Sequence, residues 1–270
     1  MSLFDYADTE RAAPDGPLVR VRLVVAYDGT DFHGFAAQPA VPTIAGQLTA
    51  GLERVLGHSV EIVGAGRTDR GVHAWGQVVS FDASRAALTR VGLVALGRGL
   101  NQLCGPDIVV REVDEVPGEF SARFSARSRR YRYTIINRPV ADPFLRRYAW
   151  WIPGPLSTRS MQAAGDALIG EHDFSSFCRR PRGPLRAEVS LVRRVLDTGW
   201  SQPEDGLLLY EIEASSFCHQ MVRSIVGTLV AMGAGDRRPG DMLSILHSRD
   251  RSAAAQIAPP HGLCLWKVQY

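Results

Sequence analysis

Apolar and polar positions alternate along residues 18–27, the first clearly patterned segment of the chain. The stretch "LVRVRLVVAY" is apolar at almost every second position and is rich in valine. A period of two with β-branched residues is typical of a half-buried strand. We therefore expect the first strand of a sheet here.

The hydrophobic period becomes helical after residue 43. The apolar positions that share one helix face are Ile44, Leu48, Leu52, Val55 and Leu56. Thr43 is a favourable N-cap, and Gly57 is a favourable residue just beyond a helix C-terminus. The pattern predicts a helix that begins after Thr43 and ends at Gly57.

The remaining pattern predicts further strands and helices in alternation. Strands are expected at 59–63, 77–82, 108–113, 129–136 and 262–270, and as a hairpin of 191–200 with 207–215. Helices are expected at 89–100, 157–170 and 217–232. Because the strands and helices show no strict βαβ repetition, the predicted class is α+β, with halves of α/β type.

The chain of 270 residues is long enough for one large domain or two ordinary ones. We expect a flexible tail at 1–17, a first subdomain at 18–115 and a second at 116–270. The tail has acidic residues and lacks the apolar stretch of a signal peptide. No apolar run reaches the roughly 20 residues of a membrane helix. These features predict a cytoplasmic protein.

Positive charge is concentrated in two windows, although the formal net charge is only +3. Residues 123–147 contain eight arginines and one acid, and residues 179–194 contain six arginines and one acid. The rest of the chain is net negative. Clustered arginine is the expected footprint of a protein that binds a polyanion such as nucleic acid.

The four cysteines are far apart in sequence, at positions 104, 178, 218 and 264. They form no CxxC pair, so zinc and redox motifs are not indicated. In a cytoplasmic protein we expect buried thiols and no structural disulfide.

The segment "GAGRTDRGVHAWGQVVSF", residues 64–81, indicates a functional loop before a strand, with catalytic loop limits of 64–76. Its glycines do not match a dinucleotide or phosphate-binding motif. A neighbouring cation such as Arg67 lowers the pKa of a carboxyl and favours an ionised Asp69, which suits a nucleophile. On spacing alone, a structural Asp–Arg pair that fixes a turn is the stronger interpretation. A metal site of His33, Asp69 and His73 is a weaker alternative.

Two further motifs contain candidate binding residues. In "RRYRYTI", Tyr131 and Tyr133 lie on one strand face, and Arg130 and Arg132 lie on the other. Such a strand can stack a base and hold phosphates, or its tyrosines can belong to the core. In "SFCHQMVRSIVG", the helical spacing places Arg223 on a polar face, in solvent or near a carboxylate.

Taken in order, six motifs resemble the TruA family of tRNA pseudouridine synthases, over about residues 21–270. They are "AYDGTDFHGF", "GAGRTDRGVHAWGQVVSF", "FSARFSARSRRYRYTI", "GEHDFSSF", "FCHQMVRSIVG" and "APPHGLCLWKVQY". The resemblance implies the pseudouridine synthase fold, in which the antiparallel sheets of two subdomains join across a basic central cleft. It also implies isomerisation of uridine to pseudouridine at positions 38, 39 or 40 of the tRNA anticodon arm.

The resemblance implies a role for each matched residue. Asp69 matches the catalytic aspartate, and Arg67 matches the arginine that displaces and holds the flipped nucleotide. Tyr131 matches the residue that packs on the uracil ring, and Arg223 matches the arginine that pairs with the aspartate. One leucine of the GLxL motif, Leu263 or Leu265, lines the pocket. Arg130 and Arg132 are expected to contact the substrate.

The resemblance further implies a homodimer, with tRNA as partner and with no cofactor, metal or membrane. One departure is visible: where the family usually has F-x-G-W-Q-x-Q, this chain has Phe35 for the tryptophan and Ala36 for the first glutamine. Two alternatives remain for experiment. One is a tRNA-binding chaperone of the same fold that does not need Asp69, and the other is a metal-dependent phosphohydrolase.

Overall fold

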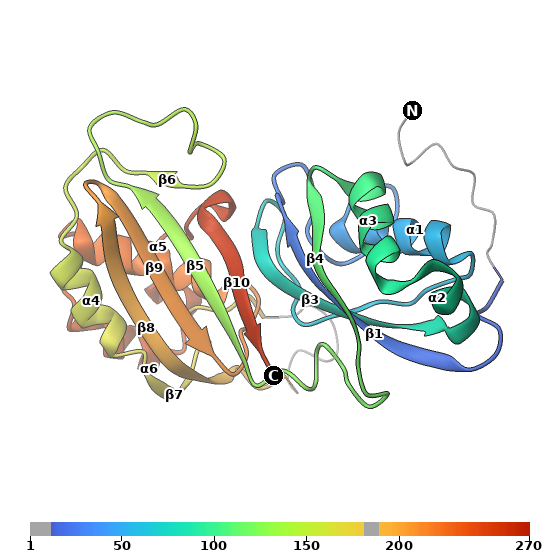
Figure 1. Ribbon diagram of the computed structural model, residues 1–270. Coiled ribbons are helices and arrows are strands. Elements are labelled where there is room, and N and C mark those ends of the chain that lie inside the picture. The colour runs from blue at the N-terminus through green and yellow to red at the C-terminus, as the bar shows by residue number, and fades with distance from the viewer. Residues whose placement is uncertain (1–11, 181–188) are drawn as a thin grey trace. The chain divides into compact units, whose positions relative to one another are not determined.

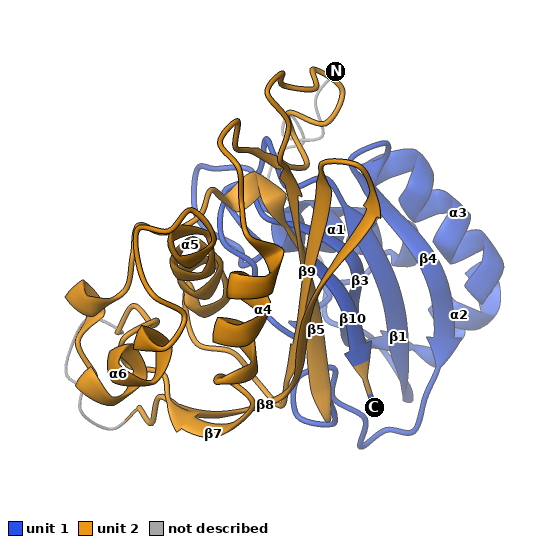
Figure 2. Cartoon of the chain, turned by 90° about the vertical axis from the view of Figure 1, so that its left-hand side faces the viewer, with its two compact units in different colours: residues 1–126, 265–268, 270 blue, residues 127–264, 269 orange. Residues whose placement is uncertain are grey.

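The computed structural model describes residues 12–180 and 189–270, which divide into two compact units (Figures 1 and 2). Unit 1 comprises residues up to 126 together with 265–268 and 270. Unit 2 comprises residues 127–264 and 269. The first unit thus extends beyond the expected limit at 115, and the end of the chain returns to it.

Unit 1 is a sheet with helices on one face (Figure 1). Its strands are β1 (Leu18–Tyr27), β2 (Val63–Gly64), β3 (His73–Ser84), β4 (Ile108–Glu115) and most of β10 (Leu263–Gln269). They run in the order β4-β1-β3-β10, with β2 beside β3, and β1 is antiparallel to both β3 and β4. The helices are α1 (Ile44–Leu56), α2 (Arg85–Val91) and α3 (Leu93–Cys104).

The core of unit 1 follows the predicted alternation. On β1 the alternate residues Val21, Leu23 and Val25 are fully buried, as are Leu48 and Leu52 of α1. Complete burial of such a side chain stabilises the fold by about 1.5–3 kcal/mol. The predicted caps of α1 are confirmed: the Gly46 amide donates to Thr43 Oγ1, and Gly57 is left-handed with φ of 84°.

Unit 2 is also a sheet with helices against one face (Figure 2). Its strands are β5 (Ser128–Ile136), β6 (Trp150–Trp151), β7 (Gly170–Asp173), β8 (Val192–Glu204) and β9 (Leu207–Ala214). They run in the order β5-β9-β8-β7, and β6 pairs with β5 in parallel. The helices are α4 (Thr158–Asp166), α5 (Met221–Gly233) and α6 (Asp241–Ser248). The predicted hairpin of β8 and β9 is confirmed.

Several predicted elements are wrong in their limits. The expected strand 59–63 is reduced to β2, because the Val60 amide donates to the Glu53 side chain instead of a neighbouring strand. The expected helix 89–100 is two helices, α2 and α3, divided at Gly92, whose φ is 78°. The helix expected from 217 begins only at Met221, and α6 was not predicted.

The described part of the predicted flexible tail is bound to unit 1. The Ser59 amide donates to the Ala12 carbonyl, and the Arg85 amide donates to the Pro17 carbonyl. Residues 1–11 lie outside the described part of the chain. Among the helices that are described, none combines the length and the apolar character required to cross a bilayer.

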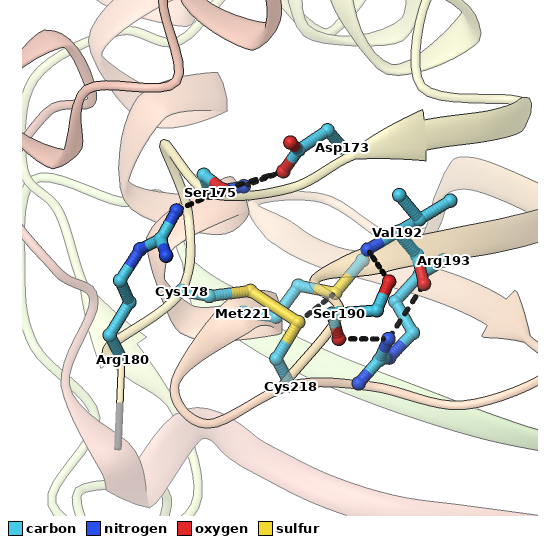
Figure 3. Close-up of a disulfide and its surroundings, with 9 residues drawn as sticks. All are labelled: Asp173, Ser175, Cys178, Arg180, Ser190, Val192, Arg193, Cys218 and Met221. Atoms are coloured by element: carbon cyan, nitrogen blue, oxygen red, sulfur yellow. Dashed lines mark hydrogen bonds between the residues drawn. A yellow bond between two sulfur atoms is a disulfide. The ribbon is translucent and has the colours of Figure 1, made fainter. Parts of the chain in front are cut away.

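The expectation of four free thiols is wrong for one pair. Cys178 and Cys218 form a disulfide with a Cα–Cα distance of 5.8 Å (Figure 3). The fold brings these positions together although 40 residues separate them, and the Arg179 amide donates to the His219 carbonyl beside them. Cys104 fits the expectation, since burial raises the pKa of its thiol to about 11.

Candidate functional site

The loop between β2 and β3 contains Asp69 and is fixed to the sheet of unit 1. The Ala65 amide donates to the Val78 carbonyl over 2.8 Å, and Gln77 Nε2 donates to the Gly66 carbonyl over 2.8 Å. Gln77 is fully buried on β3, so its amide is a rigid support. Because β3 begins at His73, the predicted loop 64–76 is shorter than expected.

Thr68, immediately before Asp69, is held by two contacts. Its hydroxyl lies 2.8 Å from the Tyr27 hydroxyl in the buried interior, and its carbonyl accepts from the Phe35 amide over 3.1 Å. Asp69 itself is only partly buried. The loop therefore presents a carboxylate from a backbone that is hydrogen-bonded on both sides, as a preorganised catalytic group requires.

Arg67 is exposed and precedes Asp69 by two residues on the same loop. Among the residues that the structure describes, Arg67 forms no ion pair, with Asp69 or with any other acid. The structural Asp–Arg pair that sequence spacing favoured is therefore not what fixes the turn; the Thr68 and Gly66 contacts fix it. Arg67 extends into solvent and is available to an anionic partner.

The residues of the metal-site alternative do not gather. His73 Nδ1 accepts from the Gly29 amide over 3.1 Å and lies 3.2 Å from Asp28 Oδ1. Within the described ranges, no three His, Cys, Asp or Glu side chains are arranged to bind a metal ion. The alternative that required His33, Asp69 and His73 together has no geometric support.

In unit 2, strand β5 buries both tyrosines of the RYRY motif. Tyr131 contacts Phe217 edge to face, with ring centroids 5.1 Å apart. The Tyr133 hydroxyl donates to the Pro259 carbonyl over 2.8 Å, and burial raises its pKa, opposed by the charge of Arg223. Tyr133 is therefore a core residue, whereas Tyr131 lies on the same face nearer the edge of that core.

Arg223 lies in the first turn of α5 and is partly buried. Its Nε donates to the Ala258 carbonyl over 2.9 Å, and the Ala258 amide donates to the Arg223 carbonyl over 3.1 Å. The helix is buried on nearly every side, so of the two settings expected for Arg223, solvent or a nearby carboxylate, full exposure to solvent is not observed. Arg223 is instead oriented by the segment that precedes β10.

Arg130 and Arg132 have carboxylate partners on β9. Arg130 Nη2 lies 2.6 Å from Glu213, and Arg132 Nη2 lies 2.6 Å from Glu211. Both are direct cross-strand pairs in the antiparallel register. The pairs give these arginines a structural function, and their contact with a substrate remains a prediction.

The other clustered arginines are also partly engaged. Arg129 donates to the Ser215 carbonyl, and Arg193 donates to the carbonyls of Ser190 and Val192. Figure 3 shows Arg180 directed at Ser175, with a separation of 3.2 Å. Arg182 and Arg186 of the second window lie outside the described residues. Clustering alone therefore overestimates the number of arginines available to RNA.

The predicted site residues thus fall in both units. Arg67, Asp69 and Leu265 belong to unit 1, whereas Tyr131, Arg223 and most of the others belong to unit 2. Leu263 and Leu265 are both buried at the beginning of β10, in unit 2 and unit 1 respectively. The structure brings Arg67 and Asp69 together on one loop and places Tyr131, Arg130 and Arg132 on one strand.

Comparison with known proteins identifies this arrangement. The family described as tRNA pseudouridine synthase matches residues 23–125 and 164–270, which include the Asp69 loop, the Arg223 helix and β10. The chain belongs to the tRNA pseudouridine synthase family. Members of this family are intramolecular isomerases, and the α+β class predicted from the sequence is confirmed.

Curated relatives match along almost their full length. tRNA pseudouridine synthase A of Brevibacillus brevis is 42% identical over 93% of this chain and 99% of the relative. The protein of the same name from Frankia casuarinae is 41% identical over 94% of this chain and 90% of the relative. An archaeal box H/ACA Nop10–Cbf5 complex matches at 11% identity with a TM-score of 0.34, over 86% of this chain and 59% of that one.

Phe35, which stands where the family motif has tryptophan, is part of the packing beneath the Asp69 loop. Phe35 is almost completely buried and lies 6.4 Å, centroid to centroid, from the Tyr27 ring. A Cβ atom at Gly64 would lie 2.5 Å from the Phe35 ring, so Gly64 must lack a side chain for the two to pack. Phe35 therefore supports the Asp69 loop from within the protein.

Sequence reasoning missed the residues that support this site. Gln77, Tyr27 and Thr68 form the network below the loop, but the sequence pattern shows them only as parts of strands or motifs. The sequence does contain a signal for Glu211 and Glu213. Acidic residues alternate along "YEIEA" as arginines do along "RRYRY", and two neighbouring strands with these patterns place opposite charges next to each other. Phe217 left no comparable signal.

Proposed function

We propose that this family member converts uridine to pseudouridine in the anticodon arm of tRNA, at positions 38, 39 or 40. The N1–C1′ glycosidic bond breaks, the detached uracil rotates, and a C5–C1′ bond forms. The hydrogen at C5 leaves to solvent as a proton, and N1 gains a proton in its place. The reaction is therefore an isomerisation and needs no redox cofactor. A uridine in a stem must first be flipped out, at a cost of a few kcal/mol.

Asp69 is the proposed nucleophile. The observation that supports this most directly is its setting: a partly exposed carboxylate on a loop whose neighbours Gly66 and Thr68 are hydrogen-bonded to buried side chains. A nucleophile gains most when its backbone is already in the reactive position. The membership of the chain in the synthase family agrees with this assignment.

Other residues have supporting roles in the proposal. Arg67, exposed and without an acidic partner among the described residues, holds the displaced nucleotide. Tyr131 packs on the uracil, Arg223 pairs with the Asp69 carboxylate, and Leu263 or Leu265 lines the pocket. We also propose a homodimer in the cytoplasm; sedimentation equilibrium of the purified chain tests the dimer.

The competing function is tRNA binding without catalysis. Such a module needs the arginine windows but not a fixed Asp69 loop. The buried Gln77 amide and the Tyr27 hydroxyl beneath that loop favour catalysis, since a passive RNA-binding surface needs no such support.

Tritium release from tRNA transcript labelled at uridine C5 tests this proposal. We compare wild type with Asp69→Asn, and use Asp205→Asn, in the β8–β9 turn, as the matched control. Wild type and Asp205→Asn should release tritium at similar rates without added metal. Asp69→Asn should lose at least about 10³-fold in rate while it still binds tRNA, because a covalent catalyst is removed.

Two results would count against the proposal. Release by Asp69→Asn at the control rate would exclude Asp69 as the nucleophile. Binding of tRNA by all three proteins without any release would favour the non-catalytic module.

A further inference from the structure

Unit 1 has an aromatic and cationic stack on an exposed part of its sheet, separate from the Asp69 loop. The Trp75 side chain of β3 is 48% exposed, and its ring stacks with Trp266 of β10 at a centroid distance of 6.0 Å and an interplanar angle of 19°. The Arg111 guanidinium of β4 lies 4.2 Å from the Trp75 ring centroid. Arg111 Nη1 also donates to the Trp75 carbonyl over 2.9 Å.

Arg111 differs from other arginines around this sheet, because those arginines form ion pairs with carboxylates. Arg20 pairs with Asp82, and Arg22 with Asp114. Arg85 pairs with Glu115. In the described part of the chain no carboxylate pairs with Arg111.

The stack also lies at the end of the sheet from which the Asp69 loop emerges. Trp75 is the third residue of β3 and follows Asp69 by six positions, so at most about 20 Å of extended chain separates them. Arg85 follows the opposite end of β3. A nucleotide a few positions away from one bound at Asp69 can therefore reach Trp75.

We propose that Trp75, Trp266 and Arg111 form a second RNA contact, which binds an unpaired nucleotide of the substrate near the target uridine. Its base stacks on the exposed indole of Trp75 or on the guanidinium plane of Arg111, and Arg111 pairs with its phosphate. Aromatic and guanidinium planes are the common stacking partners of single-stranded bases. The inference rests on the proposed function only for the identity of the RNA.

A second copy of this chain fits the same surface less well. Two-fold contacts centred on the stack would bring one Arg111 against the other, and two unpaired positive charges repel. A phosphate neutralises this charge directly. The exposed aromatic surface and the unpaired charge together therefore favour RNA over a second copy of the chain.

Binding of a fluorescent, unmodified tRNA transcript tests the inference. The variants are Trp75→Ala, Trp75→Phe and Arg111→Gln, with Arg85→Gln as the control for loss of one positive charge. Trp75→Ala should raise the Kd about five- to hundred-fold, the range expected for loss of one stacked base, whereas Trp75→Phe should retain most of the affinity. Arg111→Gln should weaken binding and reduce the slope of log K against log salt by about one, and Arg85→Gln should change neither.

Turnover separates this contact from catalysis. At saturating tRNA, Trp75→Ala should release tritium within about two-fold of the wild-type rate, with the defect confined to KM. If wild type released no tritium and Trp75→Ala still weakened tRNA binding, the proposed reaction would fail and the RNA contact would stand.

Three results would overturn the inference. One is unchanged tRNA affinity in both Trp75→Ala and Arg111→Gln. Another is a change of oligomeric mass in sedimentation equilibrium with unchanged affinity, which would assign the stack to contact between copies. The third is a loss of tRNA affinity in Trp75→Phe that is accompanied by a lower melting temperature, which would make the stack purely structural. Because Trp75→Phe and Arg111→Gln are mild substitutions, the test does not depend on whether Trp75→Ala folds.

Discussion

At the scale of single residues, the ion pairs of β5 show that some arginines of the positive windows have carboxylate partners within the protein. Arg130 and Arg132 belong to the densest positive window in the sequence, yet each guanidinium faces a glutamate of β9. Their partners differ in exposure: the Glu213 side chain is 9% exposed and that of Glu211 is 28%. Removal of the arginine partner leaves an unpaired carboxylate, and this lowers the free energy of unfolding more at Glu213, the less exposed glutamate.

We predict that Arg130→Ala lowers the free energy of unfolding by about 2–4 kcal/mol, and that Arg132→Ala, its matched control, lowers it by about 1 kcal/mol or less. Urea denaturation measures both. The affinity of the two variants for tRNA tests the predicted substrate contact of these arginines, and wild-type affinity in both variants would contradict that contact. A large, salt-dependent loss of tRNA affinity with unchanged stability would instead make both residues phosphate ligands.

The surroundings of His261 predict that the stability of the folded protein depends on pH. Burial and the nearby charge of Arg223 lower its pKa, against a hydrogen bond with the Ala149 backbone that raises it. The pKa of His261 in the folded protein lies below the ordinary value of 6.5, so the fold favours the neutral imidazole. The stability that comes from this preference is present above about pH 6.5 and is lost as the pH falls through the pKa of the folded protein.

Denaturation of wild type, His261→Gln and His247→Gln at about pH 5 and pH 7.5 measures this effect. His247 is exposed and is the control. His261→Gln should lose less stability on acidification than the other two proteins. Equal losses in all three would show that His261 does not contribute.

At the scale of elements, helix α5 and the segment before β10 are in direct backbone contact. A Cβ atom at Gly227 would lie 1.9 Å from the Gln256 carbonyl oxygen, and two residues later Ala258 accepts from Arg223. Any side chain at 227 must therefore displace the segment that orients Arg223.

Gly227→Ala should lower the free energy of unfolding by about 1–3 kcal/mol or more and should also lower tritium release, because Arg223 loses its support. Gly99→Ala in α3 is the control: its Cβ would meet only the two Val55 methyl groups, at 3.3 and 3.8 Å. That change should be nearly neutral, because alanine favours the helix. Wild-type stability and turnover in Gly227→Ala would contradict this account of Arg223.

The elements that sequence predicted well are those with local signals. The limits of α1 follow from Thr43 and Gly57, and β1 follows from its alternation. The Gly92 break and the loss of strand at 59–62 depend on a left-handed residue and on contacts with distant groups. The Cys178–Cys218 disulfide and the Arg130–Glu213 pair are likewise contacts between distant positions, so a local pattern could not show them.

The candidate site divides in the same way. The family motifs identified Asp69, Arg67, Tyr131 and Arg223 by position. They did not show that Gln77 supports the loop or that Ala258 orients Arg223, because those contacts exist only in the folded chain.

At the scale of the whole molecule, the family match extends over both compact units, and so do the residues assigned to catalysis. The proposed function therefore assigns roles in one reaction to residues of both units. The Trp75 stack adds a proposed contact from unit 1 alone, outside the residues that perform the chemistry.

Mapping of pseudouridine in an unmodified tRNA transcript is the most direct test of this account. Mass spectrometry of nuclease fragments locates every new pseudouridine after incubation with wild type or with Asp69→Asn. We predict pseudouridine at one or more of positions 38, 39 and 40 with wild type, and none with Asp69→Asn. Pseudouridine outside the anticodon arm, or the same products with Asp69→Asn, would contradict it.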